Sequence, residues 1–305
     1  MLYRFGKKLI FIFTLAIILS GCVTGRLSSY KVNPLDIIPE GFSVYLKTKK
    51  SAEAIPVIRE KLEELSSQMG VPKNFKERTE NIAALFLNDN WGYIVAQGRY
   101  PNSLIKDRLG KSDEWQEDSY RRVKYYFSDS TKTIIILLRN IIIVSDYPDD
   151  FQMEPGSANL RAEKIIDMIM SDETLIYPQV ANSVFHITSK TPDAVFAQFV
   201  TENVNFDTIS EVTFDIILDS KNKKSGGVNI SFLAEDENKA VLFNSVIRLF
   251  ISDYVVKNKI TDVRTLRENN SIFRSKDSVY VNILDIPLEK LNTFIADFII
   301  SDLSG

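Results

Sequence analysis

The order of strand-like and helix-like segments restricts the fold of this sequence more than any other feature, because the same order occurs twice. Each half of the chain predicts a strand, a helix, two strands, a helix, two or three more strands and a final helix. Closely spaced strands that alternate apolar and polar residues favour antiparallel sheets with helices on one face. The sequence therefore predicts an α+β fold with mainly antiparallel sheets.

Two short stretches of sequence also match between the halves. Residues 43–54 (SVYLKTKKSAEA) align without gaps with residues 183–194 (SVFHITSKTPDA), and residues 165–172 share five of eight positions with residues 295–302. Matches at both ends of two equal strings of elements are typical of an internal repeat, although apolar patterns can agree by chance. We therefore predict tandem, duplicated domains, each a mainly antiparallel sheet with two or three helices.

The predicted domains comprise residues 41–174 and 175–305. Their elements follow from apolar spacing, with a period of about 2 for strands and 3.6 for helices. The predicted strands are residues 42–48, 82–87, 91–97, 122–127, 133–138, 141–145, 183–188, 212–218, 228–233, 272–274 and 279–284. The predicted helices begin close to Pro56, Pro101, Ser157, Thr191, Glu237 and Pro287. The longest of them has a predicted core face of Phe243, Val246, Ile247, Phe250, Ile251 and Tyr254.

The first 22 residues have the composition of an export signal. Three basic residues precede an uninterrupted apolar run, Leu9–Leu19. A membrane-spanning helix needs about 20 apolar residues, so this shorter run predicts a removable signal peptide of residues 1–21. Residues 22–40 are predicted to form a lipidated N-terminus and a tether. The alternatives are an uncleaved apolar anchor and an ordinary signal peptide followed by a chance cysteine.

Four residues at the end of the apolar run, Leu19, Ser20, Gly21 and Cys22, resemble the bacterial lipobox at every position. The resemblance implies that a lipoprotein signal peptidase cuts between Gly21 and Cys22. It also implies that the Cys22 thiol carries a diacylglyceryl group and that the new amino terminus is acylated, with palmitate among the fatty acids. Each buried methylene contributes about 0.8 kcal/mol, and two or more chains give a stable membrane anchor. Cys22 is the only cysteine, so the exported body has no disulfide.

The residue after the cysteine, Val23, bears on which membrane holds the anchor. In Gram-negative lipoproteins an aspartate at this position favours retention in the inner membrane. Because the residue here is Val23 and not aspartate, the resemblance implies the outer membrane or cell surface. The body of the chain also resembles uncharacterised spirochaetal lipoproteins, since it is low in glycine, rich in isoleucine and lysine, and without a recognisable enzyme motif. The expected location is the cell envelope.

Net charge argues against one class of partner. The formal net charge is −3, and removal of the leader with its three basic residues leaves 34 basic against 40 acidic residues, or −6. Nucleic-acid binders normally carry a basic surplus, so we expect no nucleic-acid partner. The 19 phenylalanines and 12 tyrosines favour packed cores over disorder.

Catalytic and cofactor signatures are missing from the sequence. His186 is the only histidine, and with Cys22 assigned to lipid it has no second ligand of the kind that zinc sites use. A Ser-His-Asp triad would need His186, but no Gly-x-Ser-x-Gly motif exists. We interpret His186 as a structural strand residue, and we predict no catalytic residue, no metal and no cofactor.

Several charged clusters were weighed as sites and interpreted as structural. The first acidic group is predicted to lie in a solvated loop, and it consists of Asp146, Asp149 and Asp150. The second is predicted to favour a helix start through the helix dipole, and it consists of Glu235, Asp236 and Glu237. The lysines are predicted to form a hairpin tip (Lys221, Lys223 and Lys224 with Gly226 and Gly227), and Arg99 is predicted to lie in a turn.

One aromatic cluster leaves two interpretations open. Tyr125, Tyr126 and Phe127 are consecutive on a predicted strand. They form either an exposed strip for binding or part of a strand that is buried on both faces.

Together these observations predict a lipid-anchored envelope protein with a non-catalytic binding or scaffolding role. Its partners would be the membrane, through the lipid, and an unidentified envelope protein or small ligand in a cleft between the domains. The alternative is an envelope hydrolase that uses acidic residues alone. We expect that the protein is not an enzyme.

Overall fold

The computed structural model describes residues 33–39, 41–68, 73–87, 92–147, 157–170, 175–176, 183–196, 198–219 and 224–299. The leader with Cys22, Asp149, Asp150, Lys221 and Lys223 lie outside the described residues. The chain divides into two compact units. Unit 1 comprises Met1–Phe42 and Leu62–Pro178, and unit 2 comprises Ser43–Lys61 and Gln179–Gly305. Each unit combines antiparallel strands with helices, which confirms the predicted α+β class.

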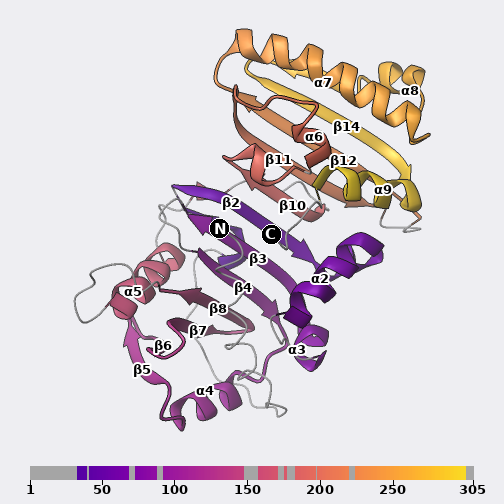
Figure 1. The fold of residues 1–305 in the computed structure, drawn as a ribbon. Coiled ribbons are helices and arrows are strands. Elements are labelled where there is room, and N and C mark those ends of the chain that lie inside the picture. The colour runs from indigo at the N-terminus through magenta and orange to yellow at the C-terminus, as the bar shows by residue number, and fades with distance from the viewer. Residues whose placement is uncertain are drawn as a thin grey trace. The chain divides into compact units, whose positions relative to one another are not determined.

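Unit 1 has a sheet with the strand order β3-β4-β8-β7-β6-β5 (Figure 1). A small pair, β1 with β9, lies apart from it. The strands are β1 (Ile37–Ile38), β3 (Thr79–Leu87), β4 (Gly92–Gly98), β5 (Gln116–Tyr120), β6 (Val123–Ser128), β7 (Thr133–Leu138), β8 (Ile141–Asp146) and β9 (Leu175–Ile176). The helices are the 3-10 turn η2 (Pro34–Asp36), α3 (Lys73–Arg78), α4 (Asn102–Gly110) and α5 (Ser157–Met170), and the end of α2 (Pro56–Gln68) also belongs to this unit.

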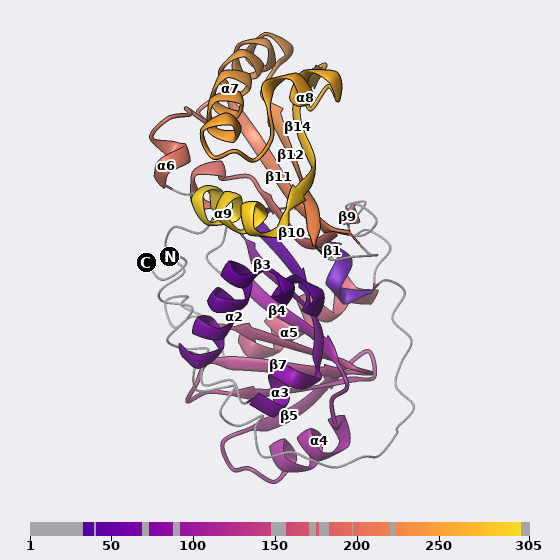
Figure 2. The same cartoon turned by 90° about the vertical axis from the view of Figure 1, so that its right-hand side faces the viewer.

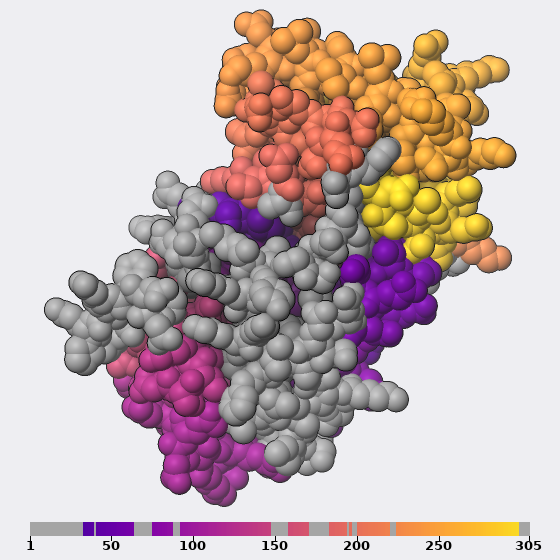
Figure 3. Space-filling view, viewed as in Figure 1, coloured from indigo at the N-terminus to yellow at the C-terminus, as the bar shows by residue number. Residues whose placement is uncertain are grey.

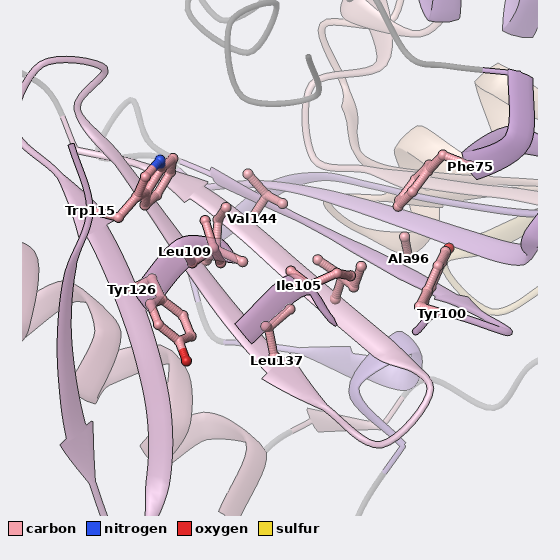
Figure 4. Packing of buried hydrophobic residues seen from close by; sticks show 11 residues of the cluster. Phe75, Ala96, Tyr100, Ile105, Leu109, Trp115, Tyr126, Leu137 and Val144 are labelled. Carbon is pink, nitrogen blue, oxygen red and sulfur yellow. The ribbon is translucent and has the colours of Figure 1, made fainter. Parts of the chain in front are cut away.

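In unit 1, β7 and β8 are buried on both faces and β6 is buried along most of its length, which decides between the two interpretations of the aromatic cluster. On one face α4 places Ile105 and Leu109 over Leu137 and Val144, as Figure 4 shows, and Tyr126 belongs to the same cluster. Tyr125 points to the opposite face, as alternation in a strand requires, and α5 contacts β5, β6 and β7. Tyr125 and Tyr126 are both almost fully buried. The cluster is therefore core, not an exposed strip.

Unit 2 has a sheet with the strand order β13-β14-β12-β11-β10-β2. Its strands are β2 (Phe42–Lys49), β10 (Ser183–Ser189), β11 (Ile209–Leu218), β12 (Ser225–Ala234), β13 (Ile272–Ser275) and β14 (Ser278–Pro287). Its helices are η3 (Lys50–Ala54), η4 (Pro192–Ala194), α6 (Gln198–Thr201), α7 (Glu237–Lys257), α8 (Val263–Glu268) and α9 (Leu288–Ile299).

One face of the unit 2 sheet is apolar and is covered by helices. Phe214, Ile230 and Val281 lie side by side on neighbouring strands, and all three are buried. Figures 1 and 2 both show α7 and α9 against this sheet, and the two helices contact β12 and β14. Because residues alternate between the faces of a strand, the residues between these apolar ones lie on the opposite face of the sheet.

The structure differs from the predicted elements in three ways. It has α3, β5 and α8, which the sequence pattern missed because each is short or strongly polar. The helix predicted after Thr191 is the short turn η4 followed by α6, and Thr191 makes no capping hydrogen bond with its side chain. In α7, Val246 belongs to the exposed side instead of the predicted core face.

The two units arrange their strands in the same sequence-to-space order. In unit 1 the hairpin β3-β4 is followed by β8 and then β7, and in unit 2 the hairpin β11-β12 is followed by β14 and then β13. In both units the connection out of the hairpin contains a helix, α4 or α7, and the last strand is followed by a helix, α5 or α9.

Candidate functional site

The charged clusters that the sequence singled out have structural roles where the structure describes them. Asp146 ends β8 opposite Thr133 and is buried, so the prediction of a solvated loop is wrong for this residue. Asp236 is the N-cap of α7, where its carboxylate accepts a hydrogen bond of 2.9 Å from the backbone N–H of Lys239. The predicted role of this acidic run at a helix start is confirmed.

The two glycines beside the predicted hairpin lysines have a packing role. Gly226 and Gly227 lie in β12, not in the tip of the hairpin. A Cβ atom on Gly226 would lie 2.5 Å from the carbonyl oxygen of Ile217 and 2.8 Å from a methyl group of Leu291 on α9. The absence of a side chain therefore lets α9 approach the sheet. Arg99 lies at the surface, where its guanidinium pairs with Glu80 at 3.1 Å.

The face of the unit 2 sheet opposite α7 and α9 carries a transverse row of polar side chains, which we call the polar row. Strand register aligns its members on five neighbouring strands. They are Lys47 on β2, His186 on β10, Asp215 on β11, Asn229 on β12 and Asn282 on β14. The first three side chains are buried, Asn229 is half-buried and Asn282 is exposed.

His186 is the centre of a hydrogen-bonded chain at the buried end of this row. Its Nδ1 lies 2.8 Å from Asp215 Oδ1, and its Nε2 lies 2.9 Å from Thr188 Oγ1. Thr188 in turn lies 3.3 Å from Thr213 Oγ1. If Nδ1 carries the proton, it donates to the carboxylate while Nε2 accepts from the Thr188 hydroxyl, and both ring nitrogens are satisfied. The ring of Tyr45 packs edge-on at 5.6 Å.

This geometry has the acid–imidazole–hydroxyl order that hydrolases use, but the hydroxyl is inaccessible. Thr188 is 0% exposed and Asp215 is 2% exposed. A nucleophile must reach a substrate and be oriented toward it. The hydrogen-bonded chain of His186, Asp215 and Thr188 can fix strand register, and it offers no surface to a substrate.

The carboxylate of Asp215 is expected to matter for stability as the acceptor for His186. Asp215→Ala should lower the free energy of unfolding by about 1–3 kcal/mol, because it leaves a buried imidazole N–H without a partner. Asp215→Asn keeps an acceptor oxygen at the same place and should cost clearly less. Urea denaturation of both variants measures the difference, and equal losses would show that the hydrogen bond is not the cause.

Sequence reasoning found His186 but not its partners, because the register of β11 against β10 is a tertiary feature. A signal was present in the alternation of polar residues Glu211, Thr213 and Asp215 along a predicted strand, which marks one face as polar. Further along the row, the side-chain oxygen of Asn229 is buried and has no hydrogen-bond partner among the described residues.

Metal-binding clusters and membrane-spanning helices are absent from the described ranges. No group of three or more histidine, cysteine, aspartate or glutamate side chains there is arranged to hold a metal ion. No helix in those ranges combines the length and apolar content that crossing a bilayer requires.

One helix, α7, carries most of the large apolar side chains that are exposed in the described part of the chain, and we call this surface the α7 face. Eight such side chains are exposed among the described residues, and five of them belong to α7. Leu242 and Leu249 are 70% and 75% exposed, and in Figure 3 the helix, in orange, lies at the surface of unit 2. Large exposed apolar patches mark interaction sites more often than scattered exposed residues do. The α7 face consists of Val241, Leu242, Val246, Leu249 and Val256.

Comparisons with known proteins identify a similar fold but no family. No protein-family model matches the sequence, and no curated protein matches it. The similar solved structures include three crystal forms of TP0453, a lipoprotein of the spirochaete Treponema pallidum. Form IV aligns with a TM-score of 0.50 and 16% sequence identity over 87% of this chain and 97% of that chain. Form III aligns with a TM-score of 0.49 at the same identity. At this identity the likeness to form IV shows a shared fold.

Proposed function

We propose that this protein is a lipid-anchored component of the bacterial cell envelope with a non-catalytic binding or scaffolding role. The observation that carries the proposal is a fold shared with TP0453 along almost the whole chain, in a sequence that places a complete lipobox after an apolar leader. Signal cleavage before Cys22 and acylation of its thiol and amino group would fasten the body to a membrane without a spanning helix.

The anchor can be tested directly at its attachment atom. In a bacterial host that processes lipoproteins, the wild-type chain should incorporate radiolabelled palmitate and sediment with membranes. Cys22→Ala removes the only thiol in the chain, so labelling should be lost, because no other side chain in a lipobox can accept the diacylglyceryl group.

A matched variant separates loss of the thiol from damage to the leader. Ser20→Ala keeps a residue that the lipobox accepts at that position, so labelling and membrane attachment should stay at the wild-type level. Palmitate incorporation by the Cys22→Ala chain would overturn the proposed anchor, as would unlabelled wild-type protein. The same fractions, separated by density, measure whether the outer membrane is preferred, as Val23 suggests.

The binding role is supported by surfaces rather than by reactive groups. The α7 face offers apolar area to a partner, whereas the acid–imidazole–hydroxyl chain of unit 2 has its hydroxyl fully buried. We propose that the protein recognises an envelope protein or small ligand without chemical conversion.

We also infer that residues 41–174 and 175–305 arose by duplication, with β2 of the first half contained in unit 2. Their common strand order, β3-β4-β8-β7 and β11-β12-β14-β13, supports this. So do the matching sequences 43–54 and 183–194, which form β2 and β10 with the turns that follow them. Shared order and shared sequence at corresponding places are what a repeat leaves behind.

A further inference from the structure

The α7 helix is apolar on two sides, and only one side is explained by the fold. Phe243, Ile247 and Ile251 are buried against the sheet. At about 100° per residue, the five residues of the α7 face fall within an arc of about 140° on the other side, centred on Leu249, and the same arc also contains Asn238, Ser245, Ser252 and Asp253. A helix in a monomer is expected to place polar residues there, so the exposed apolar side calls for a partner.

The spacing within the α7 face is that of a two-helix seam. Leu242, Leu249 and Val256 recur every seven residues, the period of one position in a coiled coil. Lys239, Val246 and Asp253 recur every seven residues beside them, at the adjacent position of the seam. A single helix can therefore pack this face along another helix of matching period.

The charges at the two ends of the seam decide its orientation and its partner. Lys239 lies near the start of α7, where it is partly exposed and paired with Glu235, and Asp253 lies near the end, where it is exposed and paired with Lys257. Two copies of α7 packed in parallel would place like charges opposite each other. Packed antiparallel with Val246 against Leu249 of the other copy, they bring Lys239 close to the other copy's Asp253, twice by symmetry. Their helix dipoles are then opposed as well.

We propose that the α7 face is the docking site of a second copy of this chain, paired antiparallel about a two-fold axis between Val246 and Leu249. A two-fold interface uses the same surface on both partners, as this seam does. The inference names a partner for the proposed binding role. One helix face is small for a stable interface, but a shared membrane anchor would raise the effective concentration of the two copies.

The geometry permits a cross-linking test on the full chain. Lys239 and Asp253 are 14 residues apart on one helix, which is about 21 Å at 1.5 Å per residue. A zero-length carbodiimide cross-link between them must therefore join two copies. The cross-linker should first act on the wild-type protein in native membranes. Mass spectrometry of the digest should then contain a peptide that links Lys239 to Asp253.

Two variants with similar starting exposure provide the control. Leu249→Asp places a charge at the centre of the seam and should lower the yield of the linked peptide at least about tenfold. Leu160→Asp changes an equally exposed leucine on α5 of unit 1 and should leave the yield unchanged. Palmitate labelling at Cys22 is independent of both variants, so failure of this inference is distinguishable from failure of the anchor.

Two outcomes would overturn the proposal. One is absence of the Lys239–Asp253 peptide in wild-type membranes although other linked peptides form. The other is a result in which no cross-link forms but the unlipidated Cys22→Ala chain binds phospholipid vesicles, and the added substitution Leu249→Asp abolishes that binding. The α7 face would then contact a bilayer and not a second copy.

Discussion

Phe294→Ala is expected to lower the free energy of unfolding by about 3–5 kcal/mol, the range for removing a buried phenylalanine ring. Phe294 is fully buried on α9, with its ring stacked at 4.1 Å on Phe298 and edge-on at 5.6 Å to Tyr254 of α7. The Tyr254 hydroxyl donates to Asp297 at 2.5 Å, which holds its ring in place. Burial, together with Asp297, raises the pKa of Tyr254, so the hydroxyl stays a donor at neutral pH.

This aromatic cluster cannot collapse easily onto the space that the ring leaves, because Tyr254 is fixed at both its ring and its hydroxyl. The measurement is chemical denaturation followed by far-UV circular dichroism. Thr293→Ala changes the exposed neighbour on the same helix and should stay within about 0.5 kcal/mol of wild type. A loss below about 1.5 kcal/mol for Phe294→Ala would mean that α9 does not pack as described.

Gly98→Ala should destabilise unit 1 by about 3 kcal/mol, at the upper end of the cost of overfilling a packed site. A Cβ atom on Gly98 would lie 2.1 Å from the carbonyl oxygen of Arg78. That carbonyl accepts a hydrogen bond of 3.0 Å from Arg99, and the Gly98 N–H donates to Asn140 at 2.9 Å. The backbone can move aside only by breaking these bonds.

The matched control for Gly98 is another glycine in the same unit. Gly110→Ala, at the end of α4, would bring its new methyl no closer than 3.9 Å to Glu117. It should be neutral or stabilising by up to about 1 kcal/mol, because alanine loses less backbone entropy on folding. Thermal denaturation of the two variants tests the pair. A Gly98→Ala protein as stable as Gly110→Ala would contradict the described approach of β4 to Arg78.

Local elements of the fold were predictable wherever apolar spacing was regular. The strands at Thr133–Leu138 and Ile141–Asp146 match their predicted ranges closely, because two apolar runs separated by two residues leave little choice but a hairpin. The turn between them contains Asn140 with a φ of 58°, a conformation that asparagine tolerates better than most residues.

The features that sequence reasoning missed depend on contacts between distant residues. Nothing local to His186 indicates that its ring is hydrogen-bonded to Asp215, 29 residues away. The α7 face was hidden for a different reason. Because α7 has apolar residues on two sides, the sequence alone does not show which side faces the sheet. Val246 was therefore predicted to lie on the core face, although it is exposed.

The membership of β2 in unit 2 has a consequence for how the protein is made and dissected. β2 pairs with β10, whose first residue, Ser183, follows the last residue of β2, Lys49, by 134 positions. β2 is made early, and its pairing with β10 must therefore wait until nearly half the polypeptide has followed it. A fragment truncated to begin at residue 175 would leave one side of β10 with unpaired N–H and C=O groups, and such an open edge invites aggregation.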